Sequence, residues 1–189
     1  MTRADDPGIN TALEGEAKVL LPGGVLRLRS TSRQDSTAIA TALADKKVAR
    51  YLAALPFPLD DEALNTYLDF LCGPGQVSKT LEWNGDFAGV ISLASQLTFW
   101  IARKYWRQGL AGCAVKWLTE THFAQSDDMP LRAQVHIANI ASIQLLNKLG
   151  FEQVGPVKRR FSFVSETAEE FVMLELSYTS WSKRQTGEG

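Results

Sequence analysis

The most informative stretch of the sequence is Trp100-Ile-Ala-Arg-Lys-Tyr-Trp-Arg-Gln-Gly-Leu-Ala-Gly112. Its apolar beginning predicts the end of a strand, and Gly109-Leu-Ala-Gly112 predicts the first turn of a helix. Small residues at a helix start let a ligand approach the backbone, whose free N–H groups and dipole favour an anion. A tight strand-to-helix turn without any ligand explains the same glycines equally well. Neither GK[ST] nor GxGxxG is present, so this is not a Walker loop or a dinucleotide fingerprint.

The segments on either side predict one strand, two helices, three strands, a helix, a strand, a helix and two strands. Asn84-Gly85 lies between apolar runs and predicts a hairpin of 77–83 and 87–93. The other predicted elements are a strand at 25–29, a helix that begins at Ser32 or Asp35 and ends before Pro56, a helix from Asp60 to Leu71, a strand at 97–102, a helix at 109–123, a strand at 131–136, a helix at 139–149 and strands at 151–163 and 170–177. This order predicts an α/β or α+β fold with a mixed sheet, rather than a doubly wound parallel sheet.

Composition places the chain among ordinary soluble globular proteins. Its 189 residues suit a single domain, and 45% of them are hydrophobic and 22% charged. We expect a lead-in at 1–24, the domain at 25–181 and a polar tail at 182–189. The net charge of −1 provides no global field for nucleic acid or an anionic membrane, so neither is expected as a partner.

Cysteine usage and the lack of long apolar runs predict a cytoplasmic location. Cys72 and Cys113 lie far apart without CxxC spacing, which predicts free thiols in a reducing compartment and no metal site. Residues 1–10 lack the apolar core of a secretory signal, and no apolar run has the length of a membrane span.

A second informative stretch is Asn139-Ile-Ala-Ser-Ile-Gln-Leu-Leu-Asn-Lys-Leu-Gly-Phe151. Asn139 is a good N-cap and Gly150 a good left-handed C-terminal residue, and such caps occur in many helices. Ser142 and Asn147 are required by neither cap, so their presence needs another explanation.

Both stretches resemble motifs of the GNAT superfamily of N-acetyltransferases. Residues 106–111 resemble the motif A pattern [Q/R]-x-x-G-x-[G/A], with Trp106 in place of Gln or Arg. A Tyr-Trp pair before the glycines is usual in the branch of Rim-type ribosomal-protein N-terminal acetyltransferases. Residues 139–151 resemble the signature N-x-A-S-x-x-x-x-x-K-L-G-F of the same family. Shorter matches extend the resemblance over residues 25–181.

The resemblance implies a GNAT-like domain whose twisted mixed sheet has helices on both faces and is splayed between the strands at 97–102 and 131–136. It implies acetyl-CoA as acyl donor and an amine as acceptor, either a protein N-terminus or a small molecule, in a monomer or homodimer without a metal. The implied acetyl-CoA-binding residues are Trp100, Ile101, Ala102, Arg107, Gln108, Gly109, Leu110, Ala111, Gly112, Asn139 and Asn147. The backbone N–H groups of 107–112 would hold the pyrophosphate.

Two residues are candidates for proton transfer. The resemblance suggests Ser142 as the donor to the departing thiolate, although a serine in the first turn of a helix is also ordinary. His136 titrates near neutrality and could serve as a base, although a histidine whose hydrogen bonds are satisfied at a strand end is more common.

One position departs from the family pattern. Many Rim-type members have a glutamate four residues before the tryptophan of the fourth strand, whereas this chain has Gln96 before Trp100. An amide cannot act as a general base. The sequence therefore leaves open a non-catalytic module that binds acyl-CoA, beside the two kinds of acetyltransferase.

Overall fold

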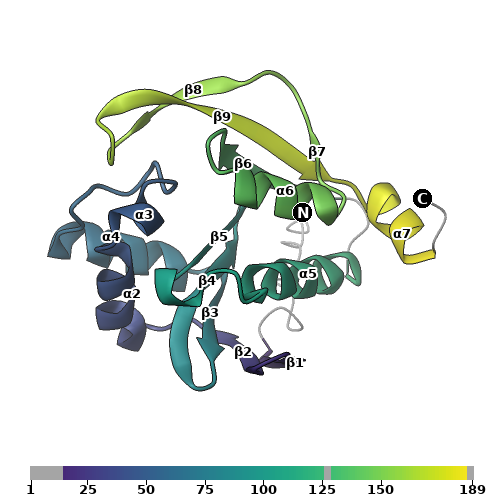
Figure 1. The fold of residues 1–189 in the computed structure, drawn as a ribbon, viewed down its shortest axis with the longest axis horizontal. Coiled ribbons are helices and arrows are strands. Elements are labelled where there is room, and N and C mark those ends of the chain that lie inside the picture. The colour runs from purple at the N-terminus through teal and green to yellow at the C-terminus, as the bar shows by residue number, and fades with distance from the viewer. Residues whose placement is uncertain (1–14, 126–128, 187–189) are drawn as a thin grey trace, which may run out of the picture.

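The computed structural model describes residues 15–125 and 129–186, which form two antiparallel sheets covered by helices (Figure 1). The strands are β1 (Ala17–Leu21), β2 (Gly24–Ser30), β3 (Val77–Trp83), β4 (Asp86–Leu93), β5 (Leu97–Ile101), β6 (Leu131–His136), β7 (Glu152–Gln153), β8 (Lys158–Ser162) and β9 (Thr167–Leu176). The helices are η1 (Arg33–Asp35), α2 (Ser36–Leu43), α3 (Lys46–Ala49), α4 (Asp61–Cys72), η2 (Arg103–Tyr105), α5 (Leu110–Phe123), α6 (Ile140–Lys148) and α7 (Tyr178–Thr186).

The first sheet has the strand order β1-β2-β3-β4-β5, with each strand antiparallel to its neighbours. The turn between β3 and β4 is the predicted Asn-Gly hairpin, in which Asn84 has a φ of +53° and Gly85 a φ of +90°. Asn84 also ties this turn to β2, since its Oδ1 accepts from the N–H of Val25 at 2.9 Å.

The second sheet has the order β6-β9-β7, and β8 pairs with the other part of β9. No ladder joins β5 to β6 among the described strands, although α5 connects the two strands directly. This break is the splay that the family resemblance predicted between the strands at 97–102 and 131–136.

Helices pack on both faces of the first sheet, as predicted. Neighbouring residues of a strand point to opposite faces. Accordingly, Val90 and Trp100 are buried in the cluster with α2 and α4, whereas Ile91 and Ile101 are buried in the larger cluster with α5 and β6. The α/β fold class is thereby confirmed, with α2, α3 and α4 at the left of the view and α5 and α6 in front of the sheets (Figure 1).

A partly buried ionic network joins β2 and β3 to η1. The Asp35 carboxylate accepts hydrogen bonds from the Arg29 guanidinium at 2.6 Å, the Thr80 hydroxyl at 3.0 Å and the Ser32 N–H at 3.0 Å. Arg29 also donates to Glu82 at 2.6 Å. Burial by itself would raise the pKa of Asp35, but these hydrogen bonds outweigh burial and hold that pKa below its ordinary value. The network fixes the position of η1 on the sheet.

The described parts of the expected lead-in and tail contain regular secondary structure. Part of the expected lead-in at 1–24 forms β1, which pairs with β2 along its whole length, while residues 1–14 lie outside the described part. Helix α7 continues past residue 181 into the expected tail, because Trp181 packs against Phe123 at a ring distance of 5.3 Å.

Two predicted elements are divided in the structure. The helix expected from Ser32 or Asp35 to Pro56 becomes η1, α2 and α3, since Asp45 accepts the N–H of Lys47 at 2.9 Å and starts a new helix. The strand expected at 151–163 becomes β7 and β8, because Gly155 has a φ of +72° and a proline follows it. No helix in the described ranges is long and apolar enough to cross a membrane.

Candidate acyl-donor and acceptor site

The connection from β5 to α5 is held by two aromatic side chains. Tyr105 is buried, and its hydroxyl donates to Asp86 Oδ2 at 3.0 Å. The next residue, Trp106, is 42% exposed, and its Nε1–H donates to the carbonyl oxygen of Ile101 at 2.7 Å. One ring therefore attaches the connection to β4 and the other to the end of β5, so the chain enters α5 from a fixed direction.

Two residues with positive φ turn the chain into α5. Arg107 has a φ of +63° and Gly109 a φ of +78°. For a residue with a side chain, such as arginine, this conformation costs on the order of 1 kcal/mol or more, and residues strained in this way cluster at ligand sites. The geometry of this turn therefore makes it a candidate for ligand binding.

The amino end of α5 presents backbone donors without acceptors. The first intrahelical bond joins the N–H of Cys113 to the carbonyl of Gly109 at 3.1 Å, so the N–H groups of Leu110, Ala111 and Gly112 have no helical acceptor. Gly109 has no side chain to cap them, and a Cβ at this position would meet nothing within 4 Å. Open space beside free N–H groups at a helix amino end fits a phosphate or pyrophosphate.

Helix α6 lies beside α5, so the two sequence motifs meet. A Cβ on Gly112 would lie 3.4 Å from Leu145 Cδ1, which shows how closely the helices approach. At the start of α6, Asn139 Oδ1 accepts from the N–H of Ser142 at 3.3 Å, and the N–H of Asn139 donates to the His136 carbonyl at 2.8 Å. Asn139 thus caps α6 as predicted, and its side chain fixes Ser142 in the first turn of the helix.

Asn147 lies away from this start. It is exposed in the last turn of α6, eight residues after Asn139, which corresponds to roughly 12 Å along the helix axis. Its carbonyl accepts from the N–H of Gly150 at 3.0 Å. The structure therefore brings Asn139 and Ser142 together at the start of α6, and it places Asn147 at the other end of the same helix.

Trp100 points its side chain away from α5. The indole is buried among α2 and α4, where its Nε1–H donates to the hydroxyl of Tyr67 at 3.0 Å, and burial raises the pKa of Tyr67 to about 12. The N–H of Ala102 donates to Ala88 at 2.8 Å. Of Trp100, therefore, only the backbone is left to contact a ligand between the sheets.

His136 ends β6, and its Nδ1 is engaged in a hydrogen bond while its Nε2 lies close to a buried carboxylate oxygen that has no hydrogen-bond partner. Nδ1 accepts from the N–H of Ala138 at 2.9 Å, which places the proton of the neutral ring on Nε2. Nε2 lies 2.9 Å from Glu169 Oε2 on β9. The rings of Tyr51 and Phe171 pack around the imidazole at 5.7 and 5.1 Å. His136 has no free lone pair in this arrangement, which weakens its candidacy as a base.

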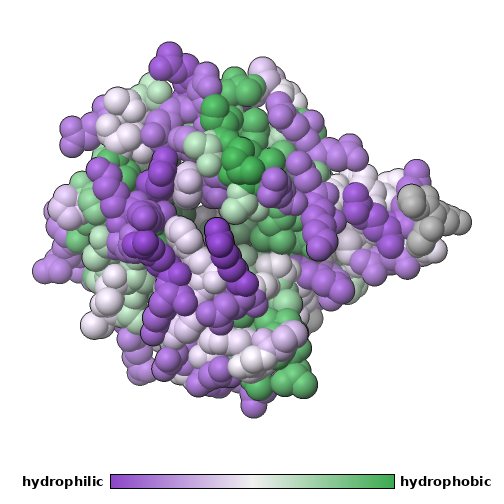
Figure 2. Space-filling model, viewed as in Figure 1, coloured by the Kyte–Doolittle hydropathy of each residue, from purple (hydrophilic) through white to green (hydrophobic). Residues whose placement is uncertain are grey.

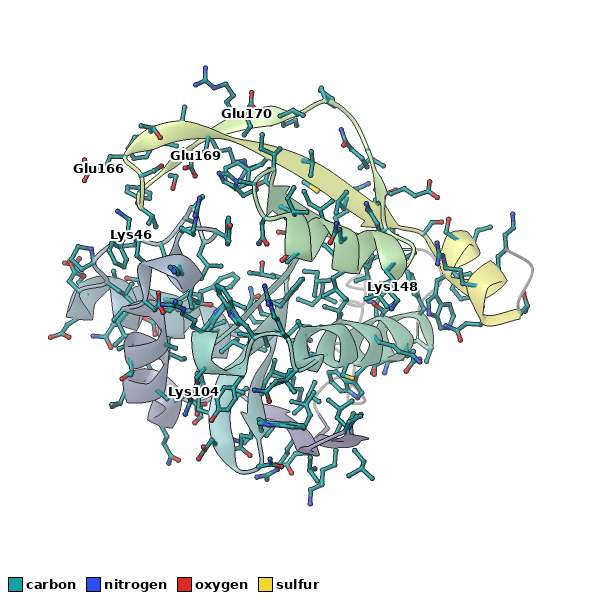
Figure 3. All side chains as sticks on the ribbon, in the orientation of Figure 1. Lys46, Lys104, Lys148, Glu166, Glu169 and Glu170 are labelled. Atoms are coloured by element: carbon teal, nitrogen blue, oxygen red, sulfur yellow. The ribbon has the colours of Figure 1, made fainter. Side chains whose placement is uncertain are left out.

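Glu169 and Tyr51 were not predicted as site residues. Glu169 and Glu170 are neighbours on β9 and lie on opposite sides of the strand, Glu169 on the side of α3 and Glu170 on the far side (Figure 3). Strand alternation alone could have separated the two glutamates, but the sequence did not show which of them would meet His136. In the same orientation the surface is hollowed near its centre, with hydrophilic side chains on the left of the opening and more hydrophobic ones above it and on its right (Figure 2).

The sequence matches a known protein family over most of its length. A family model described as an acetyltransferase (GNAT) domain matches residues 26–152. The chain belongs to this GNAT family. No curated protein matches the sequence.

Solved structures of GNAT acetyltransferases have the same fold. A putative acetyltransferase superposes with a TM-score of 0.73 at 21% identity, covering 89% of this chain and 90% of its own. Mycobacterium smegmatis RimJ, solved with a CoA disulfide, gives 0.72 at 17%, covering 93% and 96%. Vibrio cholerae spermidine N-acetyltransferase, solved with CoA and spermine, gives 0.71 at 16%, covering 83% and 98%. At these identities the likeness concerns the fold, and it does not identify the acceptor.

Gln96 lies in the turn that precedes β5 of this GNAT domain. The carbonyl of Gln96 accepts from the N–H of Ala94 at 3.3 Å, so β4 and β5 are joined by a short reversal. The described residues contain no group of three or more His, Cys, Asp or Glu side chains that could hold a metal ion. Where the family resemblance implied a carboxylate before β5, this chain has an amide, and the carboxylate of Glu169 on β9 lies beside the end of β6.

Proposed function

We propose that this GNAT domain transfers an acetyl group from acetyl-CoA to an amine. The observation that carries the proposal is the uncapped amino end of α5, where three successive N–H groups have no helical acceptor and a Cβ on Gly109 would meet nothing within 4 Å, beside the break between β5 and β6. The backbone of 107–112 would hold the pyrophosphate, and the β5 backbone from Trp100 to Ala102 would align the pantetheine arm. Acetyl-CoA supplies the activated acyl group.

The residues of the chain then have positioning and proton-transfer roles. Ser142, placed in the first turn of α6 by the Asn139 cap, is the proposed proton donor to the leaving thiolate. Gln96 can orient a water molecule but cannot take its proton. Catalysis would therefore depend mainly on alignment of the two substrates and on backbone N–H groups that stabilise the developing oxyanion.

For the acceptor, the absence of the usual carboxylate favours an amine that loses its proton easily. A protein α-amino group has a pKa of about 7.7–8.0, whereas a lysine side chain has one of about 10.4. A protein N-terminus, the acceptor of the Rim-type branch, is therefore the first candidate, and a small-molecule amine is the second.

The test is thiol release from acetyl-CoA by the purified chain, measured across peptides with different N-terminal residues and across small amines such as spermidine. Calorimetric titration with CoA gives a second readout. Turnover with one class of amine identifies the acceptor. Binding of CoA without turnover on any amine would mean a non-catalytic acyl-CoA-binding module, and absence of CoA binding would refute the proposal.

A further inference from the structure

A cavity of about 200 Å³ lies where α5 and α6 approach α7, at the right of the view (Figure 1). It is separate from the uncapped start of α5. Its two residues from that helix, Lys116 and Thr119, lie about 9 and 14 Å along the axis from Leu110, at 1.5 Å per residue. The cavity therefore belongs to the far ends of the two helices.

Three cationic side chains line this cavity, one from each helix. They are Lys116 of α5, Lys148 of α6 and Arg184 of α7, and no carboxylate within residues 15–125 and 129–186 lines it with them. Lys116 lies 3.7 Å from Glu120, but both side chains are exposed and such a pair is weak. In the described part of the chain, neither Lys148 nor Arg184 has an ion-pair partner. The cavity thus carries positive charge that its surroundings do not balance.

The end of α6 holds the Arg184 side chain in place. A Cβ built on Gly150 would lie 2.6 Å from Arg184 Nε, so the arginine packs directly on the glycine backbone. Arg184 Nη1 donates to the Lys148 carbonyl at 3.3 Å, which leaves the other guanidinium N–H groups for a further acceptor. A cation here also offsets the negative end of the α6 dipole. That effect accounts for Arg184 and Lys148, but it does not account for Lys116 on α5.

A threonine and an aromatic ring complete the lining. Thr119 is 4% exposed, and its buried Oγ1 has no hydrogen-bond partner among the described residues. A helical threonine can instead donate to the carbonyl four residues before it, as Thr121 does to Trp117 at 2.7 Å. Trp181 adds apolar surface to the cavity. A few charged and polar groups on a partly apolar lining are what a small-molecule site requires.

We propose that this cavity binds a phosphate dianion, either free phosphate or the phosphate group of a monoester. Two ammonium groups and a guanidinium complement a double negative charge, and a guanidinium can form paired hydrogen bonds to phosphate oxygens. A single carboxylate would bring only one charge to three cations. The bound anion would link α7 to α5 and α6. The site is distinct from the proposed acetyl-CoA site and does not depend on acetyl transfer.

The test is calorimetric titration of the whole chain with inorganic phosphate and with phenyl phosphate, at constant ionic strength. The expected Kd is about 1 mM or tighter at pH 8. Near pH 5 the affinity should fall by about 10-fold, because phosphate then loses its second charge while the lysines and the arginine keep theirs. Tighter binding of phenyl phosphate would identify a monoester, and equal binding would identify free phosphate. No saturable binding of either, or an affinity that does not fall toward acid, would overturn the proposal.

Matched variants locate the binding. Arg184→Gln and Lys148→Gln should each weaken phosphate binding by about 5- to 10-fold, and Arg184→Lys should lie between Arg184→Gln and the natural chain. Lys183→Gln is the control, since it removes the same charge from the next position of α7, which does not line the cavity. Equal losses in Lys183→Gln and Arg184→Gln would show a general effect of charge and would contradict a site here.

Two further titrations distinguish this cavity from the start of α5, which is also expected to attract phosphate. Gly109→Glu blocks that start and should still bind phosphate in the cavity. Lys148→Gln should bind CoA as tightly as the natural chain does. Loss of phosphate binding in Gly109→Glu, or a loss of CoA affinity in Lys148→Gln, would assign the anion to the acetyl-CoA site and overturn the proposal.

Discussion

Helices α5 and α6 both begin at the break between the two sheets, and they begin in opposite ways. At the start of α6 the side chain of Asn139 accepts the N–H of Ser142, so the helix satisfies a donor of its own. At the start of α5 the N-cap is Gly109, which has no side chain, and three donors remain. The difference teaches that a helix start can satisfy its own donors, which contributes to stability, or leave them free, which is what the proposed CoA site at the start of α5 requires.

The largest effect, a loss of CoA affinity, should follow from a negative side chain at the uncapped start of α5. Gly109→Glu would place a carboxylate in the space where the proposed pyrophosphate lies, and the affinity for CoA should fall by about 100-fold or more, equivalent to about 2.7 kcal/mol. Isothermal titration with CoA measures it. Gly85→Glu is the matched control, since Gly85 also has positive φ and nothing within 4 Å of a built Cβ.

Both variants should lose about 1 kcal/mol of unfolding free energy, because both force a side chain into the left-handed region. Only Gly109→Glu should lose CoA. If the two variants bind CoA equally well, the open start of α5 is not the donor site.

The start of η1 has a charged capping residue, Asp35. Asp35 accepts the Ser32 N–H and also pairs with Arg29, so Asp35→Asn should lower the free energy of unfolding by about 2 kcal/mol at pH 7. Because the fold lowers the pKa of Asp35, its contribution is present above the ordinary aspartate pKa of about 3.9 and is lost as the pH falls through that region.

Urea denaturation from pH 7 down to pH 3 checks this dependence. The stability difference between the natural chain and Asp35→Asn should narrow toward acid. A difference that stays constant over this range would show that the carboxylate contributes by packing rather than by charge.

The smallest effect, on stability alone, is expected at the start of α6, which Asn139 caps. Asn139→Ala should cost about 1 kcal/mol of stability, the usual value of an N-cap, and Asn139→Ser should recover most of it. Urea midpoints of the three proteins provide the measurement. If Asn139→Ala impairs CoA binding as strongly as Gly109→Glu does, then the two starts are not functionally distinct and Asn139 has a direct role in the site.

The sequence predicted those features that depend on neighbouring residues. The Asn84-Gly85 hairpin and the Asn139 cap are local, since the residues that form them are at most a few positions apart. The start of α5 was also predictable, because glycine marks the left-handed residue before it. The α/β class followed from the order of these local elements.

Features that depend on distant partners were not predicted. β1 forms a strand because all five of its residues pair with β2. Helix α7 extends further than predicted because Trp181 packs against Phe123, which is distant in sequence. Glu169 is separated from His136 by the whole of α6 and the β8–β9 hairpin, and the pairing of His136 with Phe171 places them together. No local pattern distinguishes Glu169 from Glu170.

The indole of Trp106 gives the molecule a built-in optical reporter. Of the five tryptophans, Trp83 and Trp100 are 7% and 5% exposed and Trp117 and Trp181 are half-buried. Trp106 is 42% exposed and is held at the turn into α5 by its bond to the Ile101 carbonyl. Its emission is therefore the part of the tryptophan spectrum most sensitive to what enters that turn. An adenine nucleotide bound there would quench the red side of the emission band, so occupancy could be followed in real time without a label.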